Sequence, residues 1–105
     1  MEWQTVSREK FQSIFDEEVV ALTPEAAGVL KAHAIPIFEQ PCFRSEDYGI
    51  EKVFVVARAG NRVLFFDDVE EEFGVGVPGN DGVLRDLGTF GPLVAALLAL
   101  EDRTD

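Results

Sequence analysis

The spacing of apolar residues predicts two helices in the first third of the chain. Phe11, Ile14 and Phe15 fall at intervals that place them on one helical face. The pattern therefore predicts a helix over about residues 8–22. A second helix is predicted over about residues 24–33, because a threonine–proline pair at its start favours capping and a helical first turn.

Two β-rich apolar runs at residues 53–57 and 63–66 predict a hairpin at the centre of the chain. The Gly-Asn dipeptide at residues 60–61 suits a two-residue loop that requires positive φ. This loop predicts that Val55 lies opposite Phe66 on the neighbouring antiparallel strand. Because both faces of the hairpin are apolar, we expect helices or loops to cover each of them.

The remaining segments predict two further strands, a loop and a helix. Residues 35–43 contain two prolines, which lack the N–H donor of a ladder, so we expect an edge strand or an extended linker. Residues 73–82 are rich in glycine and predict a long loop. A last strand is expected over 83–87, and a helix with a broad apolar face over 92–101.

This order of elements predicts one α+β domain over residues 1–105. We expect an antiparallel sheet of three to five strands with two N-terminal helices and one C-terminal helix. A chain of 105 residues can bury a core without disulfides. Its single cysteine, Cys42, has no internal partner, which favours a reducing compartment.

The chain shows no signal for export or membrane insertion. Its amino terminus lacks the basic region and apolar run of a signal peptide. The longest apolar run, residues 93–100, is too short to cross a bilayer. We therefore expect a cytoplasmic protein that does not bind membranes.

The charge is strongly negative and unevenly distributed. The net charge is −11, and residues 67–105 contain ten acids against two bases. Such a field repels nucleic acid and anionic membranes and attracts basic proteins or cations. We therefore expect a basic protein partner and no nucleic acid. The alternative is that the acids serve solubility alone.

The acids concentrate in residues 67–72, directly after the hairpin. They lack the spaced ligands and central glycine of an EF-hand loop, so we expect a solvated rim without a metal. Like charges this close repel each other, and a basic partner would relieve that repulsion. Tyr48, in a polar segment, is an amphipathic aromatic of the kind found in interfaces. The candidate partner-binding residues are Asp67, Asp68, Glu70, Glu71, Glu72 and Tyr48.

No set of residues predicts catalysis or a cofactor. Residues 74–79 spell a dinucleotide fingerprint, but turn residues follow where the motif needs a helix. His33 and Cys42 have no orienting third group in the sequence, and zinc needs more ligands than these two. We expect a helix-end histidine, a buried thiol, no cofactor and no enzyme activity.

The carboxy-terminal half of the chain has apolar runs at residues 53–57 and 63–67 with a turn at Gly60 between them, followed by a last helix with Phe90, Leu93, Leu97 and Leu98. In these residues it resembles SUKH-superfamily bacterial immunity proteins. That resemblance implies a cytoplasmic protein that neutralises a toxin, commonly a nuclease, by binding it. We expect a monomer or a weak homodimer. The alternative is a small-ligand or regulatory module with a pocket beneath the glycine-rich loop.

Overall fold

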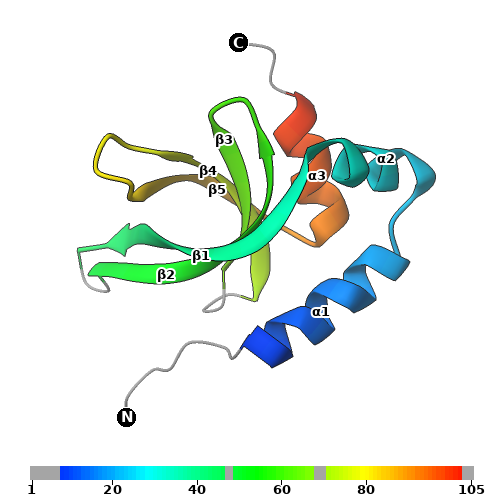
Figure 1. The fold of residues 1–105 in the computed structure, drawn as a ribbon, viewed down its shortest axis with the longest axis horizontal. Helices are drawn as coiled ribbons and strands as arrows, with labels where there is room; N and C mark the ends of the chain where they lie inside the picture. Colours follow the sequence, from blue (N-terminus) through cyan, green and yellow to red (C-terminus); the bar gives the residue numbers. More distant parts are fainter. Residues whose placement is uncertain (1–7, 47–48, 68–70, 103–105) are drawn as a thin grey trace.

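The described residues form an α+β domain with three helices and a five-stranded barrel (Figure 1). The computed structural model describes residues 8–46, 49–67 and 71–102. The elements are α1 (Arg8–Val20), α2 (Pro24–His33), β1 (Ala34–Ser45), β2 (Gly49–Ala59), β3 (Arg62–Asp67), β4 (Glu72–Pro78), β5 (Leu84–Gly91) and α3 (Leu93–Asp102).

The five strands follow one another around a closed barrel in chain order. Consecutive strands are antiparallel, whereas β1 and β5 are parallel where they close the barrel. The sheet is therefore mixed, and the expectation of a wholly antiparallel sheet was wrong. The reason is geometric: in a meander with an odd number of strands, the first and last run in the same direction.

All three helices gather on one side of the barrel (Figure 1). Thr23 caps α2 as its sequence predicts, since its hydroxyl accepts a hydrogen bond of 3.2 Å from the Ala26 N–H. The first helix ends at Val20, two residues before the predicted end. No helix in the described ranges is long and apolar enough to cross a bilayer.

The apolar side chains of the sheet form two separate cores. The barrel core fills the interior, and the helix-side core lies between the outer face of the barrel and the helices. The expectation that helices or loops cover each face was therefore wrong for the inner face, because closure of the barrel covers it. The barrel core consists of Cys42, Val53, Val55, Val63, Phe65 and Leu84. The helix-side core consists of Phe11, Ala26, Val29, Phe54, Val56, Ala57, Leu64, Phe66, Phe73, Val75, Leu93, Ala96, Leu97 and Leu100.

The hairpin between β2 and β3 has the predicted loop, but its register shifts by one residue. Gly60 has a φ of 64°, as the loop requires, and Ala57 lies opposite Leu64. Beyond that pair Val56 is bulged out, so Val55 lies opposite Phe65. The predicted pairing of Val55 with Phe66 was wrong. A bulge bends a strand and increases its twist, which is what a small closed barrel requires.

The predicted glycine-rich loop is largely a strand. Residues 72–78 form β4, and residues 79–83 remain as the connection to β5. A Cβ at Gly74 would lie 2.8 Å from the Gly88 carbonyl oxygen and 3.1 Å from Phe65 Cζ. At Gly76 it would lie 2.9 Å from the Arg85 carbonyl oxygen. These glycines therefore let β4 pass close to Phe65 and β5, rather than loosening the chain.

The β4–β5 connection is held by one carboxylate. The Val83 N–H donates a hydrogen bond of 3.0 Å to Asp81 Oδ1, and Arg85 donates one of 3.2 Å to Asp81 Oδ2. These two interactions hold the pKa of the Asp81 carboxyl below its ordinary value, with the backbone hydrogen bond contributing most.

The proline-containing segment is strand β1, neither an edge strand nor a linker. It pairs with β2 over most of its length, and with β5 at Cys42 and Phe43. Pro36 lies between Ala34 and Phe38, where the register with β2 is irregular. The strand therefore tolerates this missing N–H donor at a place where the ladder is already interrupted.

Candidate functional site

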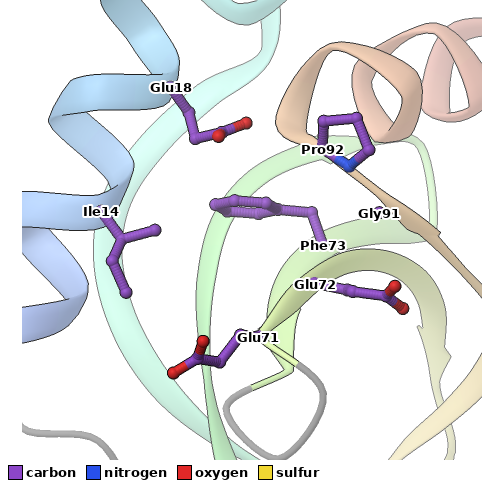
Figure 2. Close-up of a pocket in the computed structure, with 7 residues that line it drawn as sticks. All are labelled: Ile14, Glu18, Glu71, Glu72, Phe73, Gly91 and Pro92. Carbon is purple, nitrogen blue, oxygen red and sulfur yellow. The ribbon is translucent and has the colours of Figure 1, made fainter.

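A groove with a volume of about 390 Å³ lies between α1, the start of β4 and the start of α3 (Figure 2). This size falls within the usual range of small-molecule sites. Three glutamates and several apolar residues form its walls. The lining residues are Ile14, Glu18, Glu71, Glu72, Phe73, Gly91 and Pro92.

Helix α1 supplies one wall of the groove. Ile14 and Glu18 are four residues apart and therefore lie one above the other on the same helical face. The ring of Phe11 stacks on Phe54 of the barrel, with centroids 4.5 Å apart and planes 9° apart. This contact turns α1 so that the face carrying Ile14 and Glu18 borders the groove.

Glu18 joins α1 to the start of α3. The Leu93 N–H donates a hydrogen bond of 2.9 Å to Glu18 Oε1. The first N–H groups of a helix have no intrahelical acceptor, and the positive end of the helix dipole favours a carboxylate there. Glu18 therefore acts as a cap supplied from 75 residues away in the sequence.

Glu71 lies at the other end of the groove, immediately before β4. Its φ of 55° is unusual for a residue with a side chain, and it accompanies the turn of the chain into the strand. Its Oε2 lies 3.9 Å from Lys10 Nζ of α1. Both side chains are more than half exposed, at 58% and 62%, so this ion pair is weak and easily exchanged.

Phe73 forms the floor between these two ends. Its side chain is 2% exposed, and its ring lies 5.1 Å from that of Phe66 and 6.3 Å from that of Phe15. These contacts belong to the helix-side core, so the floor is fixed by packing that the fold already requires.

The three carboxylates surround the groove without converging on one point. Figure 2 shows Glu18 directed toward Pro92, and Glu71 and Glu72 directed to opposite sides. Within the described ranges, no group of three or more histidine, cysteine, aspartate or glutamate residues could hold a metal ion. The arrangement therefore spreads negative charge along the groove instead of concentrating it at one point.

The candidate residues from the sequence have different positions in the structure. Glu71 and Glu72 line the groove. Asp67 is 1% exposed and lies opposite Glu72 in the ladder, so its carboxylate is beneath the surface and forms no solvated rim. Asp68, Glu70 and Tyr48 lie outside the described residues.

Sequence reasoning missed Glu18 as a groove residue. On α1 it reads as an ordinary polar position, and its partner Leu93 is distant in the chain. The only signal in the sequence is its place one turn after Ile14, on the predicted helix that also carries Phe11 and Phe15. That spacing predicts that Glu18 lies next to Ile14 on the helix surface. It does not predict which other element Glu18 contacts.

His33 and Cys42 are not brought together. His33 ends α2, and its Nε2 lies 3.5 Å from Glu101 Oε2 on α3. Cys42 is buried in the barrel core near the far end of β1. An extended strand covers about 25 Å from Ala34, the residue after His33, to Cys42. The predicted buried thiol is confirmed, and the histidine links two helix ends.

The groove thus offers carboxylates and apolar contacts. None of its seven lining residues carries a thiol, hydroxyl or imidazole group. Such a surface fits the binding of positively charged groups through charge and shape. No model of a protein family, no curated protein and no solved structure matches this chain.

Proposed function

We propose that this chain is a non-catalytic binding protein whose acidic surface around the groove docks a basic protein. The observation that carries the proposal is the gathering of three glutamates from distant segments. Glu18 comes from α1, whereas Glu71 and Glu72 come from the start of β4. Among the described residues, Glu71 forms an ion pair with Lys10. Glu71 Oε2 and Lys10 Nζ lie 3.9 Å apart at the surface, so this pair is readily exchanged for another.

The charge of the whole chain supports the same proposal. With a net charge of −11, the protein surrounds the groove with a negative field. Such a field accelerates encounter with a basic partner and rejects nucleic acid, whose phosphates it repels. A protein that only needed solubility could carry its acids anywhere on the surface.

The groove adds shape to charge. Its floor, Phe73, is held in place by the rings of Phe15 and Phe66. A rigid floor reduces the ordering cost of binding, because the Phe73 ring is already in position before the partner arrives. A projecting side chain of the partner would enter the groove, while the surrounding carboxylates set the orientation of the complex.

The resemblance to SUKH-superfamily immunity proteins specifies the partner further. It implies a basic, nuclease-like toxin that this protein neutralises by covering its surface. Nucleases need positive charge to attract phosphate, and an acidic protein is their natural complement. The proposed interface consists of Glu18, Glu71 and Glu72, which line the groove. The sequence candidates Asp68, Glu70 and Tyr48 lie outside the described residues and stay predictions.

Paired charge variants test the proposal. The first variant, Glu71→Gln with Glu72→Gln, removes two charges at the groove. The control, Glu39→Gln with Glu46→Gln, removes the same charge from exposed positions on and just after β1. Proteins captured from native lysate would be identified by mass spectrometry, and association with the captured protein measured by stopped flow at several salt concentrations.

We expect the groove variant to slow association by about two- to fivefold at low salt and to flatten its salt dependence. The control should change both much less, because its charges lie elsewhere. Equal effects of the two variants would show that only net charge matters and would remove the groove from the interface. A captured protein that is itself acidic would overturn the proposal.

The alternative is a ligand pocket beneath a glycine-rich loop, predicted at residues 73–82. Most of that segment is a strand, since residues 72–78 form β4. A small cationic ligand in the groove remains the competing outcome of the same experiment. It would appear as retention of a small molecule by the purified protein, detected by native mass spectrometry, with no protein captured at low salt.

A further inference from the structure

We draw no further inference here: the strongest candidate, the groove between α1, β4 and α3, belongs to the site already described, and its glutamates and the α3 N-terminus are not joined by any second observation in the described ranges that identifies what it holds.

Discussion

The barrel core and the helix-side core are enclosed in different ways, although the same strands contribute side chains to both. Phe65 and Phe66 are consecutive in β3, yet one ring points into the barrel and the other toward the helices. Inside the barrel, hydrogen-bonded strands surround the ring on every side. On the outside, the ring meets other side chains carried by a separate helix.

In the barrel core the backbone itself sets the available space. Phe65 Cζ would lie 3.1 Å from a Cβ at Gly74, and its Cε1 would lie 3.3 Å from one at Gly76. The strands cannot move apart without breaking ladder hydrogen bonds, so this core has little freedom to adjust.

In the helix-side core aromatic side chains set the spacing. Phe11 of α1 stacks on Phe54 at 4.5 Å and meets Phe66 at 5.4 Å, tilted by 49°. No ladder joins α1 to the sheet, so the helix can shift when a ring changes size. A core enclosed by backbone and a core enclosed by side chains should therefore respond differently to the same substitution.

The largest effect is expected from truncating the two adjacent rings. Phe65→Ala and Phe66→Ala should each lower the free energy of unfolding by about 3 to 5 kcal/mol, measured by urea denaturation. Phe65→Ala should lie at the upper end, because the strands around it cannot collapse into the cavity. A clearly larger loss of unfolding free energy for Phe66→Ala would contradict this difference between the two cores.

Glycine substitutions should separate the close approach in the barrel from glycine in general. Gly74→Ala should destabilise the protein by about 1 to 3 kcal/mol, because the new Cβ would lie 2.8 Å from the Gly88 carbonyl oxygen. The control is Gly28→Ala in α2, where an added Cβ meets nothing within 4 Å. It should stabilise the protein by up to about 1 kcal/mol, since alanine favours a helix. Thermal or urea unfolding of both variants would show effects of opposite sign, and a neutral Gly74→Ala would contradict the close approach.

The attachment of α1 should depend on the Glu18 carboxylate. Glu18→Ala removes the acceptor for the Leu93 N–H and should cost about 0.5 to 2 kcal/mol, the range of a lost helix cap. Glu18→Gln keeps a side-chain oxygen and should cost less. Amide hydrogen exchange at Leu93 provides the local measurement, and exchange unchanged in both variants would rule out the cap.

The smallest expected effect is the coupling between stacked rings. A double-mutant cycle with Phe11→Leu and Phe54→Leu should give a coupling energy of about 0.5 to 1.5 kcal/mol. The matched cycle of Phe11→Leu with Phe65→Leu joins residues of different cores and should be additive within about 0.5 kcal/mol. Strong coupling in the second cycle would show that the two cores are mechanically one.

Elements that depend on local chemistry could be predicted from the sequence. Thr23 and Pro24 set the start of α2, and the glycine at position 60 set the hairpin loop, because capping and positive φ involve only neighbouring residues. The concentration of acidic residues was also visible in the sequence, and it indicated residues 71–72 as part of the candidate site. It did not show that Asp67 is buried, because the acid run begins at the last residue of β3, a strand that the fold covers on both faces.

How these elements close on one another could not be predicted, because it depends on contacts between distant parts of the chain. The bulge at Val56, the strand through Gly74 and the parallel contact of β1 with β5 follow from wrapping five strands into a barrel. No local propensity encodes that constraint. Glu18 became a groove residue for the same reason, because its partner Leu93 is brought to it by packing across 75 residues of chain.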